Sequence, residues 1–132
     1  MSEVRIQIER EVDIIAARQA GRQLAGQIGF SSTDQTLIAT AISEVARNIL
    51  IYAEKGEIVL GPIHDGARSG IQVVAADQGP GIENVELALR DGYSTKNSLG
   101  LGLPGARRLM DDFSLASEVG RGTRVTMKKW RR

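Results

Sequence analysis

The segments Asp77-Gln78-Gly79-Pro80-Gly81-Ile82 and Gly100-Leu101-Gly102-Leu103-Pro104-Gly105 decide the fold of this chain. In the first, an acidic residue leads a glycine turn, and in the second a glycine cluster opens onto an apolar helical pattern. Glycine lets a backbone approach a ligand closely because it has no Cβ. The start of a helix presents free N–H groups and a positive dipole end to anions. A carboxylate followed by an anion cradle is the arrangement that a nucleotide needs.

The bulk composition predicts one globular domain spanning residues 1–132, with 42% hydrophobic and 25% charged residues. A net charge of +1 gives no basis for binding nucleic acid or an anionic membrane by bulk attraction. The absence of cysteine excludes disulfides, thiolate metal sites and a cysteine nucleophile. No uninterrupted apolar run reaches the roughly 18 residues of a membrane span, and the N-terminus lacks the pattern of a signal peptide. We therefore expect a cytoplasmic protein.

The first half of the chain predicts one strand followed by two helices. Val4–Ile8 alternates apolar and polar residues, which is typical of a half-buried strand. From Val12 the period becomes helical and continues to Ile28, where Gly29 is a suitable stop. A second helix begins near Ser32, through either a Ser32–Gln35 capping box or a Ser31 cap with Phe30 as staple. This helix continues to Ala53.

The second half predicts mostly strands. Residues 57–63 form a strand broken at Gly61-Pro62, residues 64–70 form a turn-rich connection, and residues 71–76 form a buried strand. A short helix is expected at residues 84–89 and a mobile lid at 90–99. A third helix runs from Leu103 through Phe113, and two strands follow at residues 114–118 and 123–130. About five strands and three main helices predict an α+β fold with the helices on one face of the sheet.

The closing residues Lys128, Lys129, Arg131 and Arg132 predict a solvated basic tail, with docking of an acidic partner as the second interpretation.

Glu44 and Asn48 lie four residues apart on the second helix, so they share one face near the edge of the core. An amide oxygen is a hard ligand suited to Mg²⁺. A carboxylate can accept a proton from an attacking hydroxyl. The spacing alone leaves open that both are solvated helix residues.

Asp77 directly follows a buried strand and could accept a hydrogen bond from an exocyclic amine such as that of adenine. The alternative is an ordinary turn that begins with Asp. The string Gly100-x-Gly102-x-x-Gly105 matches a dinucleotide fingerprint, but that fingerprint requires a strand directly before it. What remains is a glycine-rich helix N-terminus fed by a polar segment.

Taken in order, Glu44-x-x-x-Asn48, Asp77-x-Gly79-x-Gly81, Gly100-x-Gly102 and Gly122-Thr123 resemble the Bergerat-fold ATPase and kinase superfamily. The resemblance implies a mixed sheet with helices on one face and ATP held between the helices and a lid. It implies Mg²⁺ on Asn48, Glu44 as the general base, and Asp77 on the adenine amine. The remaining implied contacts are an adenine pocket shaped by Gly79, Gly81, Ile82 and Thr123, and a phosphate cradle made by Gly100, Leu101, Gly102 and Leu103.

Within that superfamily, the segments 16–19, 40–49 and 102–111 resemble the RsbT-type serine/threonine switch kinases of the bacterial stressosome. This resemblance implies ATP-dependent phosphorylation of STAS-domain antagonists of the RsbS and RsbR kinds. It also implies activation of a PP2C-type phosphatase of the RsbU kind after release. The alternatives are an anti-sigma-factor kinase of the RsbW or SpoIIAB kind, and an interaction module that binds nucleotide without turnover. Residues 18–22, together with the lid, are the expected docking surface.

Overall fold

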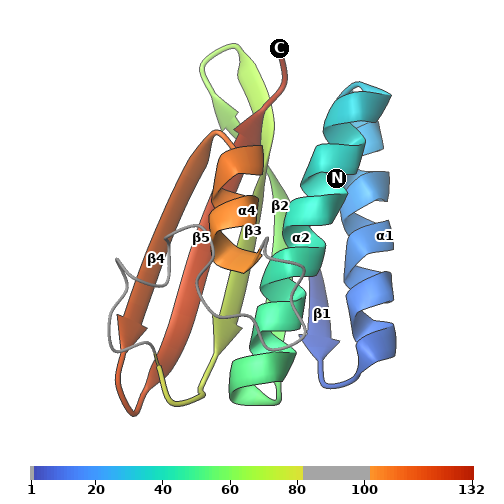
Figure 1. Ribbon diagram of the computed structural model, residues 1–132. Helices are drawn as coiled ribbons and strands as arrows, with labels where there is room; N and C mark the ends of the chain where they lie inside the picture. Colours follow the sequence, from blue (N-terminus) through green and yellow to red (C-terminus); the bar gives the residue numbers. More distant parts are fainter. Residues whose placement is uncertain (1, 82–101) are drawn as a thin grey trace.

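The computed structural model describes residues 2–81 and 102–132, and within them three helices lie on one face of a sheet (Figure 1). The short helix and the lid expected at residues 84–99 lie outside the described residues. The described elements in chain order are β1 (Val4–Ile8), α1 (Glu11–Ile28), α2 (Ser32–Ala53), β2 (Gly56–Asp65), β3 (Arg68–Asp77), α4 (Gly102–Leu109), β4 (Asp112–Glu118) and β5 (Gly122–Trp130). The predicted α+β class, with helices on one face, is confirmed.

The five described strands form one sheet in the order β1-β2-β3-β5-β4, and every neighbouring pair is antiparallel. The mixed sheet that the resemblance implied is therefore wrong in this detail. Strands β3 and β4 do run parallel, because each is antiparallel to β5. They never pair, since β5 turns back through Gly120 and enters the sheet between them.

Strand alternation gives the sheet one buried face and one uncovered face. Val73 and Ala75 of β3 pair with Met127 and Val125 of β5, and all four side chains are buried beneath the helices. Because side chains two residues apart share a face, Asp77 points to this same side at the end of β3. The largest fully buried side chains of the described residues are Ile8, Ile38, Ile42, Val45, Ile49, Ile58, Leu60, Ile71, Val73 and Met127.

The helix boundaries follow their capping residues. Gly29 has φ of 107° and its N–H donates to the carbonyl oxygen of Ala25 at 3.1 Å, so it ends α1 as predicted. Ser31 caps α2 because its Oγ accepts a hydrogen bond from the N–H of Asp34 at 3.1 Å. The Gln35 side chain donates instead to the carbonyl oxygen of Phe30 at 2.9 Å. The structure therefore has the Ser31 cap and not the Ser32–Gln35 box.

Three predicted boundaries in the second half are wrong. Strand β2 continues through Pro62, because β1 begins only at Val4, which pairs with Leu60, so that Pro62 lies on an unpaired edge where proline is tolerated. The 64–70 connection is a hairpin in which Asp65 pairs with Arg68, so only two residues form the turn. The helix α4 ends at Leu109 and not near Phe113, which is a β4 residue paired with Met127.

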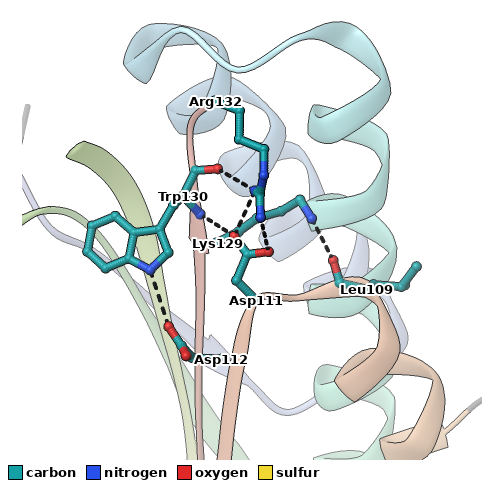
Figure 2. A network of polar contacts seen from close by, with 6 residues as sticks. All are labelled: Leu109, Asp111, Asp112, Lys129, Trp130 and Arg132. Carbon is teal, nitrogen blue, oxygen red and sulfur yellow. Dashed lines mark hydrogen bonds and ion pairs between the residues drawn. The ribbon is translucent and has the colours of Figure 1, made fainter.

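The basic chain end is not simply solvated, because part of it binds the C-terminus of α4 and the start of β4 (Figure 2). Lys129 is only 8% exposed, and its Nζ donates to the carbonyl oxygen of Leu109 at 2.9 Å. That carbonyl belongs to the last residue of α4, where helical carbonyls lack partners within the helix. Lys129 therefore caps α4 from the neighbouring strand β5.

Asp111 lies at the centre of the same network. Its two carboxylate oxygens accept hydrogen bonds from the backbone N–H of Trp130 at 2.7 Å and from the guanidinium of Arg132 at 3.1 Å. Burial raises the pKa of Asp111, but the bonds from Arg132 and Trp130 and the charge of Lys129 outweigh it. The pKa of Asp111 therefore lies below its ordinary value of 3.8.

We expect Asp111→Asn to lower the free energy of unfolding by about 1 kcal/mol at pH 7. A carboxyl whose pKa is depressed in the folded state stabilises it above the unfolded pKa, and that contribution is lost as the pH falls through the folded pKa. The difference between wild type and variant in urea unfolding should therefore shrink as the pH is lowered through and below 3.8. Asp65→Asn is the matched control, since it removes an ion pair with Arg68 whose side chains are more than half exposed. A difference that stays constant with pH would contradict the assignment.

Helix α2 is also long and apolar enough to span a membrane by length and composition, with a mean hydropathy of 1.2 over 18 residues. Half of that window is buried inside the protein. Its apolar side chains pack on the sheet and against α1, so its hydropathy reflects its place in the core.

Candidate functional site

Four of the predicted site residues, Asp77, Gly79, Gly81 and Thr123, lie where the helix-covered face of the sheet ends. Asp77 is the last residue of β3 and pairs with Gly56 of β2 on one side and Thr123 of β5 on the other. In Figure 1 the C-terminal ends of α2 and β3 and the N-terminus of α4 point toward this same end of the molecule. The topology thus brings together motifs that are far apart in the sequence.

One of the two oxygens of the Asp77 carboxylate is already hydrogen-bonded within the protein. Its Oδ1 accepts hydrogen bonds from the backbone N–H of Gly79 at 2.9 Å and of Thr123 at 3.3 Å. The predicted turn is therefore present, and Asp77 also connects the loop to β5. Its Oδ2 has no hydrogen-bond partner among the described residues. A carboxylate held by one oxygen keeps the other available to accept a bond from a ligand.

Glycine is required where the loop after β3 meets its neighbours. A Cβ on Gly79 would lie 2.5 Å from the Cβ of Ala53 at the end of α2. Gly122 has φ of 119°, and a Cβ there would overlap the carbonyl oxygen of Asp77. Gly81 lies against the backbone of Glu118 in the β4–β5 hairpin. These contacts fix the loop between α2 and the β4–β5 turn.

Glu44 and Asn48 lie on the same stretch of α2. Glu44 is buried, with 7% of its surface exposed, so the alternative of a solvated helix residue is wrong for it. Its Oε1 lies 3.5 Å from Nη1 of Arg47. Asn48 is half-buried one turn further along. Within the described part of the chain, the one ion pair of this buried carboxylate is long, so Glu44 is costly to keep for stability alone, and this favours a functional role.

Helix α2 reaches Asp77 through Ile49. A Cβ on Gly56 would lie 2.8 Å from Cγ2 of Ile49 and 3.1 Å from Cβ of Asp77, so these two residues flank the same point. Asn48 directly precedes Ile49 in the helix. The sequence pattern did not reveal the role of Gly56, which lets α2 approach the sheet here because it has no side chain.

The second glycine motif is only partly described. Gly102 begins α4 with φ of 49°, and Leu103 is 5% exposed within the core. The predicted site residues Ile82, Gly100 and Leu101 lie outside the described residues. Thr123 is where the prediction put it, on the same face as Asp77, and it is 8% exposed.

Ser117 is a site residue that sequence reasoning missed. It pairs with Thr123 across the β4–β5 hairpin, with 2.9 Å between the two hydroxyl oxygens, and its Oγ donates to the carbonyl oxygen of Gly122 at 3.2 Å. The signal was available in β4, where Phe113, Leu115 and Ser117 alternate with exposed residues.

A hollow of about 570 Å³ also opens at this end of the sheet. Its lining includes one row of paired residues across four strands: Gln7, Glu57, Ala76 and Arg124. This row alternates along the strands with the row that faces the helices. The hollow therefore lies mainly on the uncovered face, and Asp77 and Thr123, which belong to the helix-facing row, also line it.

The donor set suits a magnesium ion only if a ligand supplies further oxygens. Among residues 2–81 and 102–132, no three His, Cys, Asp or Glu side chains cluster to hold a metal. Mg²⁺ commonly takes one or two protein ligands and completes its shell with phosphate and water oxygens. Asn48 next to a nucleotide fits that mode, whereas a metal site made entirely of protein ligands does not fit the described residues.

The sheet topology, the helix-covered row ending in Asp77 and the buried Glu44 together define a nucleotide-binding domain of the ATPase and kinase type. Residues 9–129 match the model of the histidine kinase-like ATPase domain. The chain belongs to that family, and within it to the RsbT-type serine/threonine-protein kinases, as the following relative shows.

The chain is 50% identical over 127 residues to "Serine/threonine-protein kinase RsbT" of Bacillus subtilis (strain 168), covering 96% of each chain. It is also 33% identical over 118 residues to "Anti-sigma F factor" of Clostridium kluyveri, covering 86% of this chain and 82% of the relative. The solved structure of the mycobacterial sensor histidine kinase MprB superposes with a TM-score of 0.58 at 17% identity. That superposition covers 98% of this chain and 99% of the other, and it supports the fold.

Proposed function

We propose that this serine/threonine protein kinase uses Mg-ATP to phosphorylate STAS-domain antagonists of the RsbS and RsbR kinds. After its release from them it activates a PP2C-type phosphatase of the RsbU kind. The chain would act in the cytoplasm as a single ATP-binding kinase domain. The observation that carries this proposal is the pairing of Asp77 with Thr123 at the end of the helix-covered face, together with the buried Glu44 on α2, which packs on that face. The similarity to RsbT along nearly the whole chain supports the protein substrate class.

Asp77 and Thr123 would hold the base. The free Oδ2 of Asp77 can accept a hydrogen bond from the exocyclic amine of adenine, whereas guanine would place a carbonyl oxygen there. Gly79 and Gly81 are fixed against α2 and the β4–β5 turn, and together with Ile82 they would form the wall of the base pocket. These contacts favour ATP over other nucleoside triphosphates.

The phosphates would lie between α2 and the N-terminus of α4. Gly100, Leu101, Gly102 and Leu103 would present backbone N–H groups, and the positive dipole end of α4 would favour the anion. Asn48 would hold Mg²⁺, which when bound offsets the negative charge of the phosphates. The capping of α4 by Lys129 supports this role, because it fixes the opposite end of the helix.

Glu44 would serve as the general base. It accepts the proton of the substrate serine or threonine hydroxyl while that oxygen bonds to the γ-phosphorus. The bond between the γ-phosphorus and its bridging oxygen breaks, and ADP leaves. Burial keeps water away from the carboxylate and holds its side chain in place on α2.

Phosphoryl transfer from labelled Mg-ATP to a STAS-domain partner tests the proposal. We expect transfer to a serine or threonine of the partner by the wild type, and its loss in Asn48→Ala and Asp77→Ala. Asp65→Ala is the matched control, because Asp65 is exposed in the β2–β3 turn and should leave transfer unchanged. Partner binding without transfer by the wild type would contradict the kinase assignment and favour an interaction module.

A second function deserves a test because the relatives include anti-sigma F factors at 33% identity. A kinase of the anti-sigma kind would retain a sigma subunit in a nucleotide-dependent complex. Tight retention of a sigma subunit, together with failure to bind an RsbU-like phosphatase, would favour this second function over the proposed one.

A further inference from the structure

The hydroxyl groups of Ser117 and Thr123 form a pair whose donor and acceptor roles follow from their hydrogen-bond partners. Ser117 Oγ lies 3.2 Å from the carbonyl oxygen of Gly122 and 2.9 Å from Oγ1 of Thr123. A carbonyl oxygen can only accept, so the first contact uses the single hydroxyl proton of Ser117. The second contact must then use the hydroxyl proton of Thr123.

We infer that Ser117 is a positioning residue that makes Thr123 a pure acceptor toward the nucleotide base and so sets the base selectivity of the site. With its proton directed at Ser117, Thr123 Oγ1 can offer only lone pairs to a ligand. The free Oδ2 of the Asp77 carboxylate, on the neighbouring strand β3, also offers only lone pairs. The inference rests on the proposed binding of ATP.

Two acceptors that face position 6 of a purine select for an amine there over a carbonyl oxygen. The exocyclic amine of adenine carries two such donors, whereas hypoxanthine has an acceptor oxygen at the same position. If Ser117 loses its hydroxyl, Thr123 can rotate its proton outward and donate to that oxygen. Loss of Ser117 should therefore weaken discrimination against a 6-keto purine, even though Ser117 need not touch the base.

The test compares the dissociation constants of ATP and inosine triphosphate for wild type and Ser117→Ala. We expect the wild type to prefer ATP, and Ser117→Ala to reduce the ratio of the two constants by about tenfold, since one neutral hydrogen bond changes sign. Ser114→Ala is the matched control, because Ser114 lies on the same strand with its side chain exposed on the other face. It should leave the ratio unchanged.

A double-mutant cycle separates positioning from a structural effect. In Thr123→Val there is no hydroxyl to position, so adding Ser117→Ala should change the ratio no further. Ser117→Thr keeps a hydroxyl at position 117 and should retain the wild-type ratio. If Ser117→Ala does not fold, Ser117→Cys replaces it, because a thiol is a weak donor of similar size.

The outcomes distinguish this inference from the function on which it rests. Equal weakening of both nucleotides by Ser117→Ala, with an unchanged ratio, would show a merely structural role and overturn the inference alone. Failure of the wild type to bind ATP would overturn the proposed function and the inference with it. A fallen ratio with ATP binding retained would support both.

Discussion

Glu44→Gln should reduce the turnover number for phosphoryl transfer by about 10²–10⁴-fold, because a general base contributes on that scale. Gln has nearly the shape of Glu but cannot accept the hydroxyl proton. We expect the dissociation constant of ATP to change by less than about threefold, because in the proposed site Asp77 and Thr123, and not Glu44, would hold the base. Single-turnover transfer and nucleotide titration on the same preparations measure the two quantities.

The control must separate loss of the carboxylate from loss of its ion pair. Arg47→Gln removes the 3.5 Å contact to Glu44 but keeps the carboxylate. If Glu44 is the base, Arg47→Gln should retain transfer within about tenfold of wild type. Full-rate transfer by Glu44→Gln would remove the base assignment, and equal losses in the two variants would point to the ion pair instead.

Gly122→Ala should be the most damaging single-methyl change in the described part of the site. The residue has φ of 119°, and the added Cβ would overlap the carbonyl oxygen of Asp77. We expect the free energy of unfolding to fall by about 3 kcal/mol or more, from the left-handed backbone and the overlap together. Nucleotide affinity should fall as well, because relief of the overlap moves Asp77 away from Thr123. Urea unfolding and ATP titration measure both effects.

Gly120→Ala is its matched control in the same hairpin. Gly120 also has positive φ, 83°, but no atom lies within 4 Å of the place its Cβ would take. It should cost about 1–2 kcal/mol for the backbone alone and leave ATP affinity unchanged. Equal costs for the two variants would mean that the contact with Asp77 contributes nothing.

Prediction from sequence worked best where a pattern is local. The hydrophobic period of α2 and the stop of α1 at Gly29 can each be recognised within a few residues. Helices α1 and α2 accordingly end near their expected positions. It failed at Pro62 and at Phe113. Pro62 stays in β2 because a neighbouring strand stops short of it, and Phe113 leaves α4 because it pairs with Met127. Both depend on partners remote in sequence.

In the candidate site, too, local patterns could be predicted from the sequence, whereas features that depend on remote partners could not. Local motifs indicated Glu44, Asn48, Asp77 and Thr123, and the resemblance supplied their expected roles. Spacing could not show that Glu44 is buried, because burial depends on what packs against α2. Ser117 and Gly56 carried no motif, since their importance comes from the strands they pair with and the helix that approaches them.

The sequence by itself determined the class of fold and the order of the described helices and strands. It also determined which residue types are available for nucleotide chemistry. These features could be predicted because hydrophobic period, turn chemistry and motif spacing are local properties of the chain. Only the tertiary structure decided that the sheet is entirely antiparallel in the described strands. It alone placed Lys129 as the cap of α4 and joined Asp77, Thr123 and Ser117 into one row. The physical reason is that strand pairing and burial bring together groups whose separation along the chain carries no information about their distance in space.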